Sequence, residues 1–176
     1  MKKIIFILSL CLCVGTPNST FAESKGSATG LQIPRFVSLK SKRVNLRVGP
    51  GRKYSVQWLY VNPGLPVEII QEYDQWRQIR DSEGTEGWVF HSLLSGKRTA
   101  IIAPWDRKKE DEQATFTKAY ATNSTDGTIA ANLEPGLVVK IESCGKSWCN
   151  IANERFSGYL PKPKIWGVYP EEVIED

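Results

Sequence analysis

The chain has few of the residues from which most hydrolytic sites are built. Its 176 residues contain one histidine, His91, and four cysteines. A Cys–His nucleophile pair needs a free thiol beside an imidazole, and no serine stands in the Gly-x-Ser-x-Gly pattern of α/β-hydrolases. We therefore predict that the chain is not an enzyme, and we interpret His91 as an ordinary polar side chain.

Long apolar runs are missing after the first 22 residues. Lys2 and Lys3 precede an apolar run at residues 4–14, and Thr20-Phe21-Ala22 offers small residues at a cleavage site. We expect residues 1–22 to be a signal peptide. The alternative, a retained single-span anchor, is disfavoured because a membrane helix needs about 20 apolar residues. The expected protein is periplasmic or secreted, with no integral membrane segment after signal cleavage.

A strong charge imbalance is missing as well. Losing Lys2 and Lys3 lowers the formal net charge from +4 to +2. A nucleic-acid binder is usually dominated by a basic patch, so we predict no nucleic-acid partner.

Two of the four cysteines, Cys11 and Cys13, lie in the predicted signal peptide, which leaves Cys144 and Cys149. An even pair in an exported chain favours a disulfide, and the four residues between them suit a hairpin loop with facing cysteines. The alternatives are a redox pair, whose motifs favour a two-residue gap, and half a zinc site lacking two further ligands. We predict a structural disulfide worth about 2 kcal/mol, and neither a metal nor another cofactor.

Helical periodicity of useful length is also absent, and an internal repeat is present instead. A Pro-Gly-Leu turn is followed twelve residues after its glycine by a tryptophan, and then by a Gly-aromatic-aliphatic triplet. These landmarks are Gly64, Trp76 and residues 87–89 in the first copy, and Gly136, Trp148 and residues 158–160 in the second. The offset is 72 residues at the first two landmarks and 71 at the third, which indicates two copies of one small β module.

Short apolar or alternating runs between turn residues predict the strands. In the first module they lie at residues 36–39, 44–48, 54–60, 65–73, 76–81 and 86–90, with a 3₁₀ turn at 91–94. In the second module they lie at residues 115–122, 128–133, 137–143, 148–153 and 157–160, and residues 99–103 are strand-like. The carboxylates Glu68, Glu72, Asp81 and Glu83 are expected to be solvated.

The domain boundaries follow from composition. We expect a flexible leader at residues 23–34, which are rich in Ser, Gly and Lys, and a first domain at 35–97. A second domain is expected at 98–167, with a charged, solvated loop at 106–113. An acidic, irregular tail is expected at 168–176.

Four motifs of the first module occur in the order found in a known family. They are Val44-Asn45-Leu46-Arg47-Val48-Gly49-Pro50-Gly51, Gly64-Leu65-Pro66-Val67-Glu68-Ile69, Trp76-Arg77-Gln78-Ile79 and Gly87-Trp88-Val89. Together they closely resemble the bacterial Src-homology-3 (SH3) family. With His91-Ser92-Leu93-Leu94 and residues 98–105, the pattern is similar to the exported subgroup of Gram-negative bacteria. The resemblance implies an all-β chain of two tandem small SH3-like β barrels, the second of them degenerate because it lacks the Asn-Leu-Arg start.

Aromatic side chains make the first module a candidate binding surface. Tyr54, Trp58, Tyr60, Tyr73, Trp76 and Trp88 fall within 35 residues. A barrel this small can bury only two or three of them, so the others are expected to be partly exposed and available to sugars or peptides. Arg47 stands near the Gly-Pro-Gly loop, where it can pair with a carboxylate or cap the loop backbone.

We accordingly predict a ligand-binding set of Arg47, Tyr54, Trp58 and Trp76. The family resemblance implies an exported, non-catalytic envelope module that recognises cell-wall peptide, peptidoglycan or a protein partner. One alternative is a scaffolding subunit that binds only another envelope protein, and a remote one is a wall hydrolase.

Overall fold

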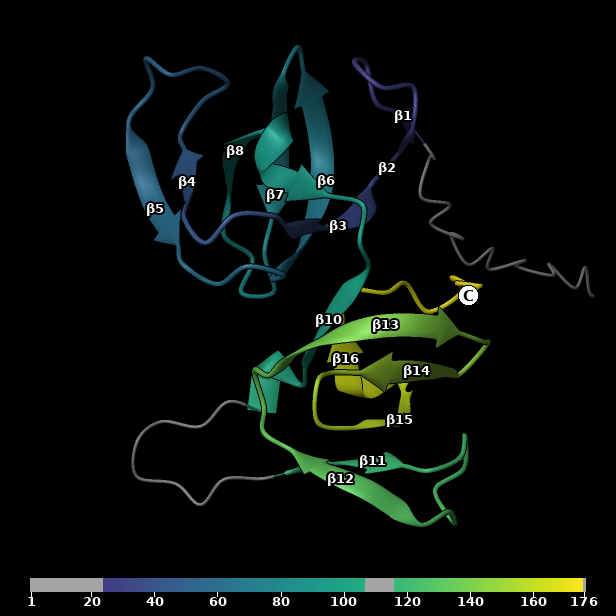
Figure 1. Cartoon of the computed structure of the whole chain (residues 1–176). Coiled ribbons are helices and arrows are strands. Elements are labelled where there is room, and N and C mark those ends of the chain that lie inside the picture. The colour runs from purple at the N-terminus through teal and green to yellow at the C-terminus, as the bar shows by residue number, and fades with distance from the viewer. Residues whose placement is uncertain (1–23, 107–115, 176) are drawn as a thin grey trace, which may run out of the picture.

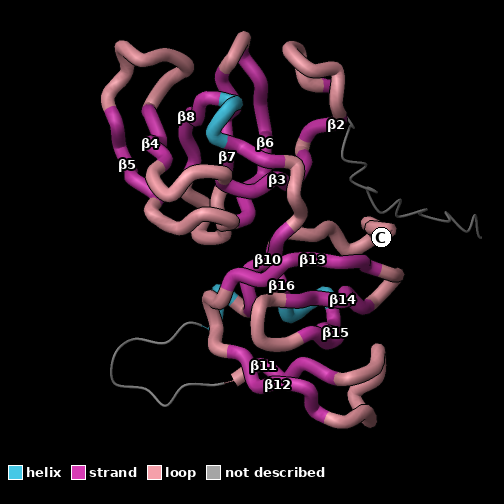
Figure 2. The backbone as a smooth tube through the Cα atoms, viewed as in Figure 1, coloured by secondary structure: helices cyan, strands magenta, loops and turns pink. Residues whose placement is uncertain are grey.

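The computed structural model describes residues 24–106 and 116–175. The predicted signal peptide and nearly all of the predicted charged loop lie outside these residues. The described chain is built of strands and loops with three single-turn 3₁₀ helices (Figure 2), and the all-β prediction is confirmed. None of its helices is long and apolar enough to span a bilayer.

The first module is a seven-stranded antiparallel sheet in the order β5-β4-β8-β7-β6-β3-β9 (Figure 1). Its elements are β3 (Arg35–Leu39), β4 (Val44–Arg47), β5 (Val56–Tyr60), β6 (Pro66–Tyr73), β7 (Trp76–Arg80), β8 (Glu86–Phe90), η1 (His91–Leu93) and β9 (Leu94–Ser95). The long strand β6 has a register shift between Ile69 and Gln71. The core of the first module is mainly aliphatic, and Val44, Leu46, Ile79 and Val89 are fully buried in it.

The second module repeats this plan in the order β12-β11-β15-β14-β13-β10-β16. Its elements are β10 (Thr99–Ile102), η2 (Pro104–Asp106), β11 (Thr117–Tyr120), β12 (Ile129–Leu133), β13 (Val138–Cys144), β14 (Trp148–Ala152), β15 (Ser157–Pro161), η3 (Lys162–Lys164) and β16 (Ile165–Trp166). Cys144 pairs with Cys149 across the β13–β14 hairpin, and the predicted disulfide between them is confirmed.

A hairpin of β1 (Ser24–Lys25) and β2 (Gln32–Ile33) occupies most of the stretch expected to be a flexible leader. That expectation is wrong because Glu72 holds the hairpin. Its carboxylate accepts hydrogen bonds from the backbone N–H groups of Ala28 and Thr29, at 3.0 and 2.9 Å, and from the Thr29 hydroxyl at 2.8 Å. Arg35 donates to the same carboxylate at 2.7 Å.

Glu72 is consequently only 5% exposed, not solvated as expected. Burial by itself would raise the pKa of this carboxyl, but the hydrogen bonds from Arg35, Thr29 and Ala28 outweigh burial and lower it to about 2. A buried carboxylate thus fastens the hairpin to β6.

Glu68 is also buried, at 6% exposure, because it lies at the joint between the modules. Its Oε2 accepts from Arg80 Nε at 3.0 Å, and its Oε1 accepts from the Tyr169 hydroxyl at 2.7 Å. Phe36 of the first module packs against Trp166 and Tyr169, with ring centroids 4.9 and 4.7 Å apart. These contacts join the two modules through polar and aromatic side chains together.

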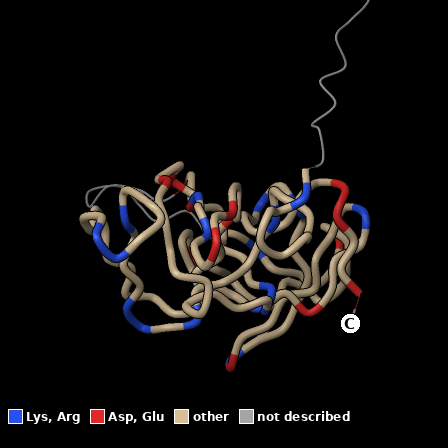
Figure 3. The backbone as a smooth tube through the Cα atoms, turned by 90° about the horizontal axis from the view of Figure 1, so that it is seen from above, with Lys and Arg blue, Asp and Glu red and all other residues tan. Residues whose placement is uncertain are grey.

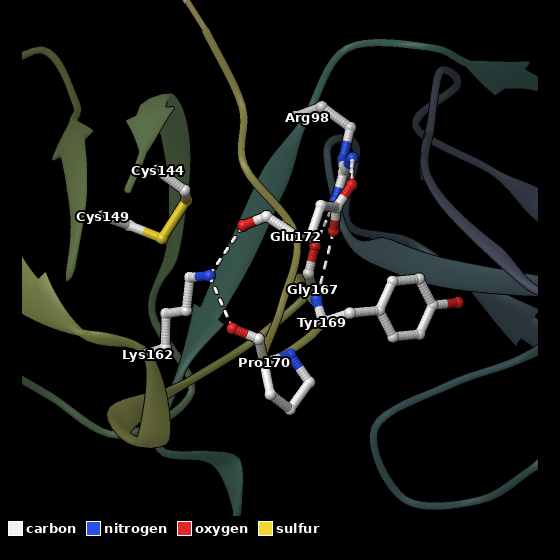
Figure 4. Close-up of a disulfide and its surroundings, with 8 residues drawn as sticks. All are labelled: Arg98, Cys144, Cys149, Lys162, Gly167, Tyr169, Pro170 and Glu172. Carbon is white, nitrogen blue, oxygen red and sulfur yellow. Dashed lines mark hydrogen bonds and ion pairs between the residues drawn. A yellow bond between two sulfur atoms is a disulfide. The ribbon is translucent and has the colours of Figure 1, made fainter. Parts of the chain in front are cut away.

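Residues 167–174, which we call the C-terminal strap, run from this joint back to the disulfide (Figure 4). Arg98 pairs with Glu172 and donates to the Gly167 carbonyl at 2.8 Å. Buried Lys162 donates to the carbonyl oxygens of Pro170 and Glu172, at 2.8 and 2.6 Å. Ile174 and Cys144 exchange two backbone hydrogen bonds. The residues expected to be an acidic, irregular tail are therefore bonded to both modules.

Candidate functional site

A shallow hollow of about 460 Å³ lies on the first module. It is lined by Asn45 and Arg47 from β4, Arg52 from the β4–β5 loop, Trp76 from β7, Phe90 from β8, and Ser92 and Leu93 from η1. This lining contains two guanidinium groups and two large aromatic rings, and it contains no carboxylate.

Strand alternation explains how the sequence builds this hollow. Val44 and Leu46 of β4 are buried in the core, so Asn45 and Arg47 project from the other face. The register of β7 and β8 sets Trp76 directly opposite Phe90, and their rings meet edge to face with centroids 5.5 Å apart. Both rings are half-buried, and both line the hollow.

Arg47 serves the loop and the hollow at once. Its Nη1 donates to the carbonyl oxygens of Tyr54 at 2.6 Å and of Arg52 at 3.3 Å, so it does cap the loop backbone. Its Nε and Nη2 have no hydrogen-bond partner within residues 24–106 and 116–175. The guanidinium is therefore held in place while part of its donor set stays free for a ligand.

Two of the predicted binding residues lie outside the hollow. Tyr54 is 36% exposed and its ring lies against Gly49, where an added Cβ would come within 2.6 Å of Tyr54 Cδ1. Trp58, on β5, is 58% exposed. The structure thus brings the side chains of Arg47 and Trp76 together in the hollow and leaves the side chains of Tyr54 and Trp58 outside it.

The predicted binding set lacks five lining residues; four are Asn45, Arg52, Ser92 and Leu93, and the fifth, Phe90, is the aromatic one among them. A signal for it exists, because the tight turn between β7 and β8 fixes the register that places Phe90 opposite Trp76. Tyr60, by contrast, follows Trp58 closely in the sequence, yet it is buried and its hydroxyl donates to Asp81 at 2.8 Å.

The second module does not reproduce the hollow. Tyr120 pairs with Tyr159 as Arg47 pairs with Trp88, so a tyrosine occupies the position of the arginine. The Tyr120 ring packs on Trp148, with centroids 5.9 Å apart, and Pro161 lies opposite Trp148, where the first module has Phe90. The cation is therefore lost, and an aromatic ring stands in its place.

The bacterial SH3 domain family matches the chain twice, over residues 40–96 and 113–167. The chain belongs to this family. The resemblance to the bacterial SH3 family is therefore confirmed, and the two matches correspond to the two seven-stranded sheets. Bacterial SH3 domains are typically binding modules, so this SH3 protein belongs to a family of binders.

Other comparisons add little to this SH3 assignment. NlpC2 from Trichomonas vaginalis is 13% identical, with a TM-score of 0.33 over 77% of this chain and 49% of that one. NlpC1 from the same organism is 14% identical, with a TM-score of 0.33 over 80% of this chain and 48% of that one. The SH3 protein spans about half the length of these two structures, and likeness at this level carries no argument about activity. No curated protein matches the chain.

Proposed function

We propose that this chain is an exported, non-catalytic binding protein of the cell envelope whose first SH3 module recognises a carboxylate-bearing peptide of the cell wall. The observation that carries the proposal is the hollow on β4, β7 and β8. It combines Arg47 and Arg52 with the Trp76–Phe90 pair, and no carboxylate lines it.

Each part of the hollow has a matching ligand group. A guanidinium fork binds a carboxylate through two parallel hydrogen bonds, and the free Nε and Nη2 of Arg47 together with Arg52 offer such donors. The aromatic pair provides a face for an alanine-like or sugar-ring surface. Asn45 and Ser92 add polar groups for the peptide backbone. Because the hollow is shallow, we expect micromolar rather than nanomolar binding.

Two further features support export and the lack of catalysis. Disulfides persist mainly in oxidising compartments outside the cytoplasm, and the Cys144–Cys149 bond leaves no free thiol among the described residues. His91, the only histidine of the sequence, is exposed, and its ring centroid lies 5.0 Å from that of Phe90. Neither arrangement resembles an activated nucleophile with its base.

The test is co-sedimentation of the protein with purified peptidoglycan, using Arg52→Glu against Lys146→Glu as a matched control. Both side chains are exposed and neither forms an ion pair within the described residues. We expect Arg52→Glu to weaken binding at least tenfold, because a hydrogen bond to a charged group is worth about 1.5–3 kcal/mol, and Lys146→Glu to leave it unchanged.

Equal pelleting of the two variants would contradict the assignment to this hollow. Absence of pelleting at low salt would contradict a wall ligand altogether and favour a protein partner.

A further inference from the structure

The charges of the first module are unevenly distributed along the chain. Residues 24–67 contain eight Lys and Arg residues and no Asp or Glu. The cations are Lys25, Arg35, Lys40, Lys42, Arg43, Arg47, Arg52 and Lys53. Figure 3 shows the outcome: the left margin of the molecule, on the side where Figure 1 places β5, carries Lys and Arg without Asp or Glu.

Strand β5 forms an open edge in this basic region. It pairs with β4 alone and ends the seven-stranded sheet, and no backbone hydrogen bond within the described residues joins it to another strand. Residues 54–67 contain no charged side chain. Natural edge strands are usually blunted by Lys, Pro or inward-pointing charges, so an uncharged edge is a ready template for another strand.

Apolar side chains gather on and beside the same strand. Of the eleven large apolar residues exposed within the described chain, five fall between residues 48 and 61. They are Val48, Tyr54, Val56, Trp58 and Val61. A clustered exposed apolar surface with a polar rim is typical of an interaction site.

The strand register places cations at both ends of this edge. Val44 lies opposite Tyr60, so Lys42 and Arg43, which precede β4, lie beside the far end of β5. Arg47 lies opposite Val56, so the loop carrying Lys53 lies beside its beginning. The open edge of five residues is about 17 Å long. Gln57 is its one polar residue, the other four are apolar or aromatic, and cations lie at each end.

The other sheet edges lack this combination. Strands β9 and β16 have two residues each. The equivalent edge of the second module, β12, is flanked by Asp126 and Glu134 and carries Ala130 and Ala131. The apolar, cation-flanked edge is therefore specific to β5 among the edges of the two seven-stranded sheets.

We propose that β5 binds an extended acidic segment of a partner protein as an added strand, with apolar residues of the segment on Val56 and Trp58 and carboxylates at its ends on the flanking cations. Backbone pairing would supply affinity, and the side-chain contacts would supply specificity. This surface is separate from the hollow, because neither Val56 nor Trp58 lines it.

Charge complementarity selects this occupant over a second copy of the chain. Two β5 edges related by a two-fold axis would pair antiparallel, so Lys53 of each copy would face Lys42 and Arg43 of the other. Like charges so placed oppose association. An acidic segment avoids this repulsion, because its carboxylates are attracted to the same cations.

The experiment pans a displayed library of random 12-residue peptides against the purified protein and measures the enriched consensus peptide by fluorescence polarisation. The variants are Trp58→Lys, the pair Lys42→Glu/Arg43→Glu, and Ile129→Lys on β12 as the matched control. We expect a consensus with alternating apolar residues and acidic flanks. Its binding should weaken at least tenfold in the first two variants, stay unchanged in the third, and fall with added salt.

Amide exchange provides a second readout that does not depend on a variant. We expect the β5 amides to gain protection when the consensus peptide is bound, while peptidoglycan pelleting by Trp58→Lys stays at the wild-type level. The proposal is overturned if no acidic consensus is enriched, if Trp58→Lys binds the consensus peptide as wild type does, or if sedimentation shows a dimer that this variant abolishes.

Discussion

Protonating or neutralising Glu72 should release the N-terminal hairpin. In the folded chain this carboxylate accepts three hydrogen bonds from residues 28 and 29 and one from Arg35, and Arg77 Nε lies 3.4 Å away. Glu72→Gln keeps the size of the side chain but removes the charge. The N–H donors of the new amide group would then face the N–H groups of Ala28 and Thr29, which donate to Glu72 in the wild type. Acid has the same effect without a mutation.

The magnitude follows from the pKa. The pKa of Glu72 is about 2 in the folded chain, against an ordinary value of 4.5. Because one pKa unit corresponds to about 1.36 kcal/mol, the lowered pKa is worth about 3 kcal/mol. The folded pKa lies below the unfolded one, so this stability is fully present above pH 4.5 and is lost as the pH falls toward 2.

Urea unfolding followed by tryptophan fluorescence at pH 6 and pH 3 measures this loss. Wild type should lose stability between the two pH values, and Glu72→Gln should start lower and change less. The hairpin can also detach before the module unfolds, so amide exchange at Ala28 and Thr29 should be followed at pH 6. We expect it to accelerate about 100-fold in the variant, as a loss of about 3 kcal/mol implies.

Glu154→Gln is the matched control, because Glu154 is exposed and forms no ion pair within the described residues. Unfolding of Glu72→Gln at the wild-type urea concentration, with unchanged exchange at residues 28 and 29, would refute this role of Glu72. An equal loss of stability in the two proteins between pH 6 and pH 3 would refute it as well.

Two further changes test the joint and the barrel. Tyr169→Phe removes the 2.7 Å hydrogen bond to Glu68 and should cost about 2 kcal/mol in urea unfolding; a loss below about 0.5 kcal/mol would mean that this bond does not stabilise the joint. Gly87→Ala would put a Cβ 2.6 Å from Leu46 Cγ and 2.9 Å from the Arg47 carbonyl oxygen and should cost about 1–3 kcal/mol. Gly96→Ala, which meets nothing within 4 Å, is its control, and equal thermal midpoints for the two glycine variants would contradict this expectation of close packing at Gly87.

The strands are predictable because their signals are local. Alternation in residues 44–48 indicates β4, and the repeated tryptophan and Gly-aromatic landmarks indicate β7, β8, β14 and β15 within a few residues of their bounds. Turn residues and side-chain period need no knowledge of distant partners.

The buried carboxylates are not predictable for the opposite reason. Glu72 meets Thr29 from 43 residues away, and Glu68 meets Tyr169 from 101 residues away. In the sequence each looks like an exposed strand residue, and only the assembled fold supplies its partners. The same holds for the leader, whose Gly and Ser composition suggests flexibility until Glu72 is in place.

The hollow is predictable in part. Arg47 and Trp76, which both line it, can be picked out because both belong to family motifs. Phe90 requires the β7–β8 register, and the separation of Trp58 from the hollow requires knowing that β5 ends the sheet.

The contact between Glu68 and Tyr169 has a consequence for synthesis. The two residues are 101 positions apart, so the whole first module emerges before Tyr169 does and waits for its partner residue. Throughout that interval Phe36 lacks Trp166 and Tyr169, and the Glu68 carboxylate lacks one of its donors. An emerging chain of this protein therefore exposes the apolar ring of Phe36 beside a Glu68 carboxylate that lacks one hydrogen-bond donor, and we expect a chaperone to bind at this surface.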